Sequence, residues 1–441
     1  MDNNKIGLKE AISIGIGGMV GGGIFAVLGL AVSLSKGGTP VAFLFAGLIA
    51  LITAYSYARL SVAFPDHGGT VKFINQGFGR NVFSGGINNL LWVSYIIMLS
   101  LYAAAFGAYA PNLFPITKSA TADFHIYASG IIVLATLVNY YSIKVVAAIE
   151  SYAVGFKLVI LILFVIIGLY GLRTSANLSQ LSFHYWESPF RLLTGGMVIF
   201  VAYEGFELIA NAAPDILNPV KNIPRAYYYA VIFVILLYVV IAIITVGSLP
   251  FGKIAAARDY VLAEAARPVL GQVGFVFITV AALISTFSAI NATIYGGSRV
   301  NYEIAEDDQL PYALTGMLWN QPIGLLITVI FTLLICNVLN LENIADAGSI
   351  GFLLIFAAVN FLGFKFSGTI GTIKVIPFTG FVLCLLATAA LIAQQYRTDT
   401  RGVLIAISII AACFIMEFIY KRTRRGGQLK AGTINDESKS I

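Results

Sequence analysis

Two carboxylates and one amine lie in stretches of the sequence that are otherwise apolar. Glu204 and Glu207 occur in the segment VIFVAYEGFELIANAA, where a continuous helix would place them on one face. Lys157 lies in the segment AVGFKLVILILFVIIGLYG, with apolar residues on both sides. Charged groups inside membrane-length apolar segments are costly and usually functional. We therefore take Lys157 as a candidate proton carrier, and prefer this interpretation over a structural lysine whose amine reaches the membrane surface.

A run of glycines lies in the middle of the first apolar segment. Residues 15–23 read GIGGMVGGG. Glycine is the poorest helix former after proline, so this run predicts a helix that breaks inside the membrane. Backbone N–H and C=O groups freed at that depth must line a cavity or bind a ligand. A broken first helix of this kind is typical of a substrate site, and the chain is predicted to be a transporter.

The sixth apolar segment contains a second candidate break, at Gly205 between the two glutamates. One glycine is a weak signal, because small residues also serve helix packing. The sequence Glu-Gly-Phe-Glu within an apolar segment is a stronger one. Breaks in the first and sixth spans occupy corresponding positions if the core consists of two inverted repeats of five spans.

The composition requires a membrane protein. Of the 441 residues, 59% are hydrophobic and 11% are charged, and the mean hydropathy is +0.88. A soluble domain could not bury that much apolar surface. A span needs about twenty apolar residues, and we place twelve spans near residues 8–35, 40–63, 84–113, 125–143, 148–172, 190–213, 226–249, 270–302, 321–340, 346–366, 372–394 and 401–421.

The loops and termini set the expected orientation and the expected partners. Lysine and arginine in the loops favour both termini in the cytoplasm, for a multi-pass protein of the cell membrane. Residues 1–421 are predicted to form a single membrane domain, followed by a polar cytoplasmic tail over 422–441. The net charge of +6 is scattered over short loops and this tail, which disfavours nucleic acid as a partner. The stretch 249–268 is either a short amphipathic helix over an external entrance or a plain surface connector.

No motif for enzyme chemistry is visible in the sequence. The three cysteines lie in apolar runs and form neither a disulfide framework nor a metal-ligand spacing. P-loop and nucleophile-elbow motifs are also missing from the sequence. We therefore predict no catalytic residue, no metal and no cofactor. A channel is disfavoured as well, because the polar residues are concentrated near the middle of the spans instead of following a continuous pore.

Several motifs, in order along the chain, resemble the amino acid–polyamine–organocation superfamily of transporters. GGMVGGGIF is followed by YEGFE, by NPVKNIPRA and by the eighth-span stretch SAINATIYGGSRVNYEIAEDDQLP. The segment FPDHGGTVKFINQGFGRNVFSGGINNLLWVSY, between spans two and three, extends the similarity over nearly the whole chain. Within the superfamily, the chain is most similar to ApcT-type, proton-coupled transporters of broad amino acid specificity, which carry a lysine at the position matching Lys157.

This resemblance implies a fold of the leucine-transporter type. The protein would be an all-α membrane protein of twelve transmembrane helices, with helices 1 and 6 broken at the midplane. Spans 1–5 and 6–10 would form two inverted five-helix repeats over about residues 8–172 and 190–366. Two extra helices would follow over about residues 372–421.

The resemblance also implies a substrate site built largely from backbone groups at the two breaks. The substrate carboxylate would bind the N–H groups of Gly21, Gly22 and Gly23. A half-helix N-terminus carries partial positive charge and free donors, which suits an anion. The carbonyl groups of Met19, Val201 and Glu204 would hold the substrate ammonium. The ring of Tyr203 would lie beside them.

In the same family, the lysine amine replaces a sodium ion between helices 1 and 8. The amine of Lys157 would then contact the carbonyl of Gly17 and the hydroxyl of Ser285. The protonated amine would tie these helices together, and its deprotonation would release them, so transport would depend on protons and not on sodium. Glu207 is a second candidate proton site, although the pair of glutamates departs from the ApcT-type pattern.

The expected function is a proton-coupled, sodium-independent amino acid symporter that works by alternating access. An amino acid exchanger, or a polyamine or amine transporter on the same scaffold, is the alternative. A polyamine lacks the carboxylate that the glycine run would bind, which disfavours that substrate. The sequence does not identify the amino acid, the stoichiometry or the oligomeric state.

Overall fold

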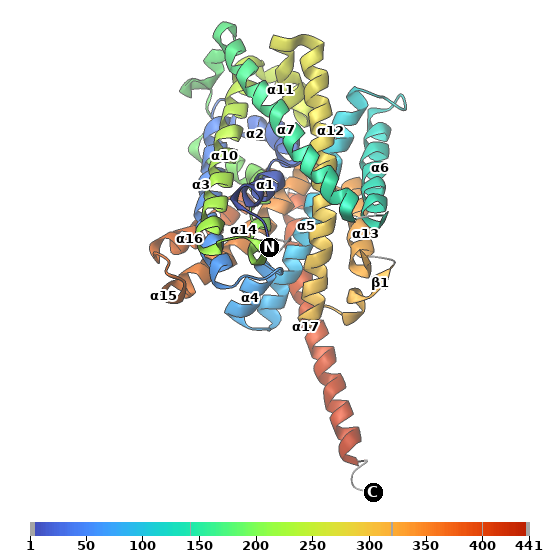
Figure 1. The fold of residues 1–441 in the computed structure, drawn as a ribbon. Coiled ribbons are helices and arrows are strands. Elements are labelled where there is room, and N and C mark those ends of the chain that lie inside the picture. Colours follow the sequence, from blue (N-terminus) through green and yellow to red (C-terminus); the bar gives the residue numbers. More distant parts are fainter. Residues whose placement is uncertain (1–4, 142, 319–320, 399, 438–441) are drawn as a thin grey trace.

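The computed structural model describes residues 5–141, 143–318, 321–398 and 400–437, and almost all of them are helical (Figure 1). The first half of the chain forms α1 (Leu8–Met19), α2 (Gly23–Ser35), α3 (Thr39–Ala63), α4 (Thr70–Phe78), α5 (Val82–Tyr109), α6 (Ala120–Tyr141) and α7 (Ile143–Gly171). The second half forms α8 (Pro189–Val198), α9 (Leu208–Asn211), α10 (Pro219–Ser248), α11 (Phe251–Ala256), α12 (Val261–Glu306), α13 (Ile323–Val338), α14 (Leu341–Lys365), α15 (Ser367–Ile370), α16 (Val375–Thr398) and α17 (Thr400–Glu437).

Short elements join these helices. The 3-10 turns are η1 (Ala110–Asn112), η2 (Leu172–Thr174), η3 (Leu178–Leu181), η4 (Phe183–Tyr185), η5 (Ile199–Tyr203), η6 (Ala213–Asp215), η7 (Arg258–Tyr260) and η8 (Tyr312–Thr315). Strands β1 (Met317–Leu318) and β2 (Gln321–Pro322) pair in an antiparallel ribbon.

The helices confirm an all-α membrane protein. Within the described residues, ten helices are long and apolar enough to cross a membrane, or eleven if the bent pair α1 and α2 counts as one span. The helix over the predicted ninth span, α13, has only 16 residues. The predicted number of twelve spans therefore depends on α13 also crossing the membrane.

Local sequence accounts for the start of several helices. The Asn81 side chain accepts hydrogen bonds from the N–H groups of Phe83 and Ser84 at the start of α5. Asn340 caps α14 in the same way, by accepting from the N–H of Asn343 at 2.8 Å. A proline at the first position of α8 follows a Ser188 cap. Such caps satisfy N–H groups that have no partner within the helix.

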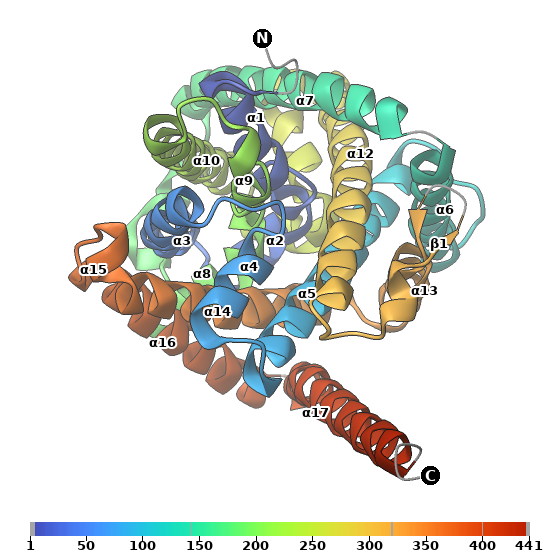
Figure 2. The same ribbon diagram turned by 60° about the horizontal axis from the view of Figure 1, so that its bottom comes forward.

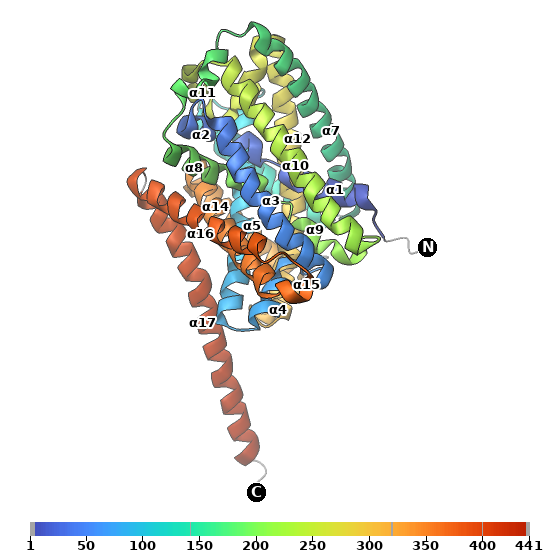
Figure 3. The same ribbon diagram turned by 90° about the vertical axis from the view of Figure 1, so that its left-hand side faces the viewer.

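The first two helices lie in the middle of the bundle. Viewed from the α4 end, α1 and α2 are surrounded by α3, α5, α7, α10, α12 and α14 (Figure 2). Nearly every residue of α2 is buried. The last helices, α16 and α17, lie on the side of the bundle away from α7 (Figure 3). The glycine-containing first segment is therefore an interior element.

The stretch 249–268 forms separate short elements and not one amphipathic helix. It contains α11 and η7 and then enters α12. Within α12, Gly271 has a positive φ of 59° and interrupts the helix. The predicted eighth span, residues 270–302, corresponds to the part of α12 that follows this kink.

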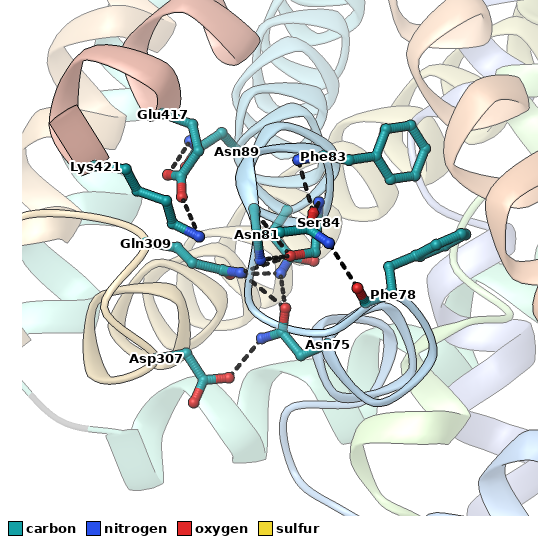
Figure 4. A network of polar contacts seen from close by, with 11 residues as sticks. Asn75, Phe78, Asn81, Phe83, Ser84, Asn89, Asp307, Gln309, Glu417 and Lys421 are labelled. Atoms are coloured by element: carbon teal, nitrogen blue, oxygen red, sulfur yellow. Dashed lines mark hydrogen bonds and ion pairs between the residues drawn. The ribbon is translucent and has the colours of Figure 1, made fainter.

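A cluster of amide side chains joins α4, α5 and the residues that directly follow α12 (Figure 4). Asn88 donates to the side-chain oxygens of Asn75 at 3.0 Å and Gln309 at 2.7 Å. Gln309 in turn donates to Asn75 at 2.9 Å and to the Ser84 hydroxyl at 3.1 Å. Asn75 also donates to Asp307 at 2.6 Å. These bonds fix the short helix α4 against two long helices.

Beside this cluster, a buried carboxylate attaches α17 to α5. Glu417 is fully buried, lies 3.3 Å from the amine of Lys421 and accepts from Asn89 at 3.5 Å. The glycine at position 85 leaves the space for it, because a Cβ atom there would lie 2.2 Å from the Glu417 carboxyl carbon. The Glu417 carboxylate can therefore occupy this position only because residue 85 has no side chain.

We expect Glu417→Ala to lower the free energy of unfolding by about 2 kcal/mol, because it removes the ion pair with Lys421 and the hydrogen bond from Asn89 and leaves a small cavity. Thermal unfolding in detergent measures this change. The exposed Glu306 offers the control, since Glu306→Ala removes a carboxylate that packs against no helix core. Equal stabilities of the two variants would contradict a role of Glu417 in attaching α17.

Candidate functional site

The first helix is broken at the glycine run. Helix α1 ends at Met19, α2 begins at Gly23, and their axes differ by 48°. The three residues between them are all buried. The N–H groups in the first turn of α2 have no partner within that helix, as at any helix start. The break thus brings the N–H and carbonyl groups of two helix ends into the middle of the protein.

The sixth apolar segment is also interrupted. Its first part, α8, continues as the 3-10 turn η5, and α9 begins only at Leu208. Gly205 has φ of +116°, a conformation that favours glycine. The hydroxyl of Ser349, from α14, accepts from the N–H of Val201 at 3.2 Å and donates to the carbonyl of Val198 at 2.9 Å. Ser349 therefore supports the backbone just before the break.

The two breaks are in direct backbone contact. A Cβ atom at Gly18 would lie 2.7 Å from the carbonyl oxygen of Gly205, and one at Gly205 would lie 2.3 Å from the carbonyl carbon of Gly18. A Cβ atom at Gly23 would lie 2.8 Å from the Cα atom of Ala202. Only glycine permits such an approach on both sides of the first break. The residues predicted at the two breaks therefore meet in one place.

Lys157 reaches the first helix next to the break. Its side chain is fully buried, and its amine donates to the carbonyl of Gly17 at 3.0 Å. The hydroxyl of Ser285, from α12, donates to the carbonyls of Val20 at 3.1 Å and Gly21 at 2.9 Å. The expected lysine contact with Gly17 is present. Ser285 contacts the same broken helix, but at the turn itself.

The two glutamates form a buried pair between tyrosines. Glu204 is 4% exposed and Glu207 is 1% exposed. Tyr102 donates to Glu204 at 3.3 Å and Tyr95 donates to Glu207 at 3.4 Å, and Glu207 also accepts from the N–H of Gly205 at 2.8 Å. The two carboxyl groups are both buried and lie close enough for their charges to interact. Two ionised carboxylates in such a buried place would repel each other, so the arrangement favours a proton on one of them.

Two tyrosines at the breaks were not predicted as site residues. The Tyr238 hydroxyl, from α10, donates to the carbonyls of Met19 at 2.7 Å and Ala202 at 3.3 Å. The ring of Tyr102, from α5, packs on Gly22, where a Cβ atom would lie 2.4 Å from Cδ1 of the ring. Both residues lie in ordinary apolar helices, and nothing in their local sequence signals this role.

Tyr203 points away from the turn. Its hydroxyl donates to the carbonyl of Phe43 in α3 at 2.9 Å, and its ring lies 5.3 Å from that of Tyr238. It was expected to flank the substrate. In the structure its ring stays next to the break, while its polar end joins two helices.

Comparison with known proteins places these features in a family. The chain matches the family model described as amino acid permease over residues 6–415. It is 33% identical over 423 residues to the inner membrane transport protein YbaT of Escherichia coli, covering 96% of this chain and 97% of that protein. It is 32% identical over 428 residues to an uncharacterised protein of Methanocaldococcus jannaschii, with coverage of 96% and 97%. The branched-chain amino acid permease BcaP of Bacillus subtilis is 23% identical over 334 residues, with coverage of 70% and 69%.

Proposed function

Because the chain belongs to the amino acid permease family, within the amino acid–polyamine–organocation superfamily, we propose that it is a proton-coupled, sodium-independent amino acid symporter. Family and relatives make it a transporter and not an enzyme. The proposal includes alternating access, a leucine-transporter-type arrangement of twelve spans with α13 as the ninth, and cytoplasmic termini in the cell membrane. Its partners are an amino acid, protons and the lipid bilayer.

The substrate site in this proposal is the junction of the two breaks. The N–H groups of Gly21, Gly22 and Gly23 bind the substrate carboxylate at the start of α2, where the helix dipole favours an anion. Gly18 and Gly205 bring the second break against the first. A zwitterion held by backbone groups fits a family that carries amino acids, and a polyamine would leave the carboxylate position empty.

The carbonyl groups of Met19, Val201 and Glu204 hold the substrate ammonium in this proposal. The carbonyl of Met19 already accepts from Tyr238 at 2.7 Å. A carbonyl oxygen has two lone pairs and can accept from the ammonium as well. Tyr238 then positions this carbonyl, and substrate binding need not break its hydrogen bond.

One observation supports proton coupling above all others. A fully buried amine, Lys157, donates to a carbonyl of the broken helix two residues before its end. A protonated amine makes a charge-assisted bond that a neutral amine cannot match. Protonation of Lys157 therefore strengthens the attachment of α1 to α7, and deprotonation loosens it. Ser285, bonded to the turn, attaches α12 to the same helix.

Glu207 is the second proton site of the proposal. It accepts from the hydroxyl of Tyr95 at 3.4 Å and from the N–H of Gly205, the residue after Glu204, at 2.8 Å. The pair lies at the break of the sixth segment, so its protonation state acts on the same backbone that holds the substrate ammonium. If both Glu204 and Glu207 were ionised, two negative charges would lie close together, which is strongly unfavourable in a buried site.

Uptake of labelled amino acids into proteoliposomes tests this function, with proton and sodium gradients imposed separately. We expect accumulation when the outside is more acidic than the inside, collapse of accumulation with a protonophore, and no response to a sodium gradient. Sodium-dependent accumulation would contradict proton coupling. Uptake that needs amino acid inside the vesicles would instead identify an exchanger.

A further inference from the structure

An apolar groove lies between the last two long helices. Helix α16 ends at Thr398 and α17 begins at Thr400, and the two helices diverge from this junction (Figure 3). The groove between them has a volume of about 530 Å³, its lining residues are all apolar, and α5 and α14 form its floor. All four helices are long and apolar enough to span the membrane. Phe83 and Leu385, both in the lining, are 46% and 41% exposed, so the groove opens toward the lipid.

Five phenylalanine rings form an arc around the end of this groove that lies next to α4. The ring of Phe381 in α16 lies 5.6 Å from that of Phe361 in α14, which stacks on Phe78 of α4 at 5.9 Å. Phe78 lies 4.9 Å from Phe83 of α5, and Phe83 lies 6.1 Å from Phe414 of α17. The arc therefore runs from one wall of the groove, across its floor, to the other wall.

A lysine lies beside the middle ring of this arc. Lys365, the last residue of α14, is exposed, and its amine lies 5.9 Å from the centre of the Phe78 ring. The amine donates to the carbonyl of Gly77 at 2.6 Å, which leaves two of its three N–H donors for another partner. Lys374, which directly precedes α16, is also exposed. Within the part of the chain that the structure describes, neither lysine forms an ion pair. The groove thus has an apolar body and a positively charged end.

The size and the charge of the groove favour a lipid over a protein helix as its occupant. A helix is about 10 Å across with its side chains and rises about 5.4 Å per turn, so a volume of 530 Å³ holds little more than one turn. An acyl chain is narrower, and each CH₂ group that it buries favours binding. Lysines at the membrane surface attract lipids with negatively charged headgroups.

We propose that this groove binds one phospholipid of net negative charge. An acyl chain lies between α16 and α17, along α5 and α14, and the headgroup phosphate accepts from the amine of Lys365. The site lies in the leaflet on the α4 side, which is the cytoplasmic leaflet in the proposed orientation. The bound lipid contacts α14, the helix whose Ser349 supports the backbone before the second break.

Native mass spectrometry of the full chain tests this site by counting the lipids retained per chain. The protein is released from nanodiscs made of equal parts phosphatidylglycerol and phosphatidylcholine, and we expect it to retain phosphatidylglycerol in preference. Lys365→Gln should lower this preference about fivefold, the effect of one basic residue near the membrane surface. Lys365→Arg keeps the charge and should keep the preference. Ala358→Leu narrows the groove, which Ala358 lines, and should lower the retention of both lipids.

The matched control is Lys221→Gln. Lys221 is an exposed lysine in the first turn of α10, a helix that contributes no residue to the groove lining. An unchanged unfolding temperature in phosphatidylcholine alone shows that the variants are folded. Ala358→Leu tests the groove without a change in charge if Lys365→Gln proves unstable.

Three results would overturn the lipid site. They are equal retention of the two lipids by the wild-type protein, equal preference in the Lys365→Gln and Lys221→Gln proteins, and a dimer that retains no lipid. In the last case a second copy of the chain, and not a lipid, covers the groove. Because none of these measurements involves uptake, the proposed transport function would still stand.

Discussion

Lys157→Ala is expected to abolish proton-driven amino acid accumulation in proteoliposomes, down to the level of protein-free vesicles. The substitution removes the amine that donates to the Gly17 carbonyl. Without it, protonation can no longer change how strongly α1 is held to α7. The measurement is initial uptake with the outside acidic, repeated over a range of external pH.

Two further substitutions at the same position separate charge from packing. Lys157→Met keeps most of the side-chain volume but has no proton to carry, so it should match the alanine variant. Lys157→Arg keeps a positive charge that cannot be lost in a protein, so the protein should bind substrate without completing the cycle. The exposed Lys221 serves as control, and Lys221→Ala should transport normally. Unchanged pH dependence in Lys157→Met would rule out the lysine as proton carrier.

Gly22→Ala should reduce the affinity for substrate at the breaks by about a hundredfold, because displacement of a binding group by about 1 Å can cost that much. The new Cβ atom would lie 2.4 Å from the ring of Tyr102 and 3.1 Å from a methyl carbon of Thr286. The turn, the ring or both must move. Equilibrium binding of the transported amino acid to the purified protein measures the change.

A double-mutant cycle identifies the cause of this loss. Tyr102→Ala removes the ring that meets the new methyl group, so the double variant should lose less than the sum of the two single variants. Gly130 provides the control, because a Cβ atom there meets nothing within 4 Å. Gly130→Ala should bind normally. Full affinity in Gly22→Ala would contradict the assignment of the carboxylate site.

Local sequence was sufficient for the elements with the strongest physical signal. The glycines at 15–23 disfavour a continuous helix wherever they occur, and the structure breaks the helix between Met19 and Gly23. The Glu-Gly-Phe-Glu sequence similarly coincides with an interruption, at Gly205. Apolar segments of sufficient length predicted the membrane helices, apart from the short α13. These properties depend on backbone preference and on solvation, and both act within one segment.

The residues that contact the two breaks are distant from them in the chain. Tyr102, Tyr238 and Ser349 contact the breaks through hydroxyl groups or a ring. In the sequence they are single polar atoms within apolar helices, and any of them could have faced lipid or a neighbouring helix. Which side they face is decided when α5, α10 and α14 pack around the first helix.

Lys157 is a similar case. The sequence predicted that its side chain is buried, but local sequence did not identify the group that it contacts. Only the resemblance to known transporters named Gly17, and the packing of α7 on α1 brings the two within 3.0 Å. The loop between α10 and α12 shows the limit more clearly, because nothing in its local sequence indicated that Arg258 would pair with Glu342. Backbone breaks and buried charges follow from local physical chemistry, whereas contacts between them follow from long-range packing, which one segment does not encode.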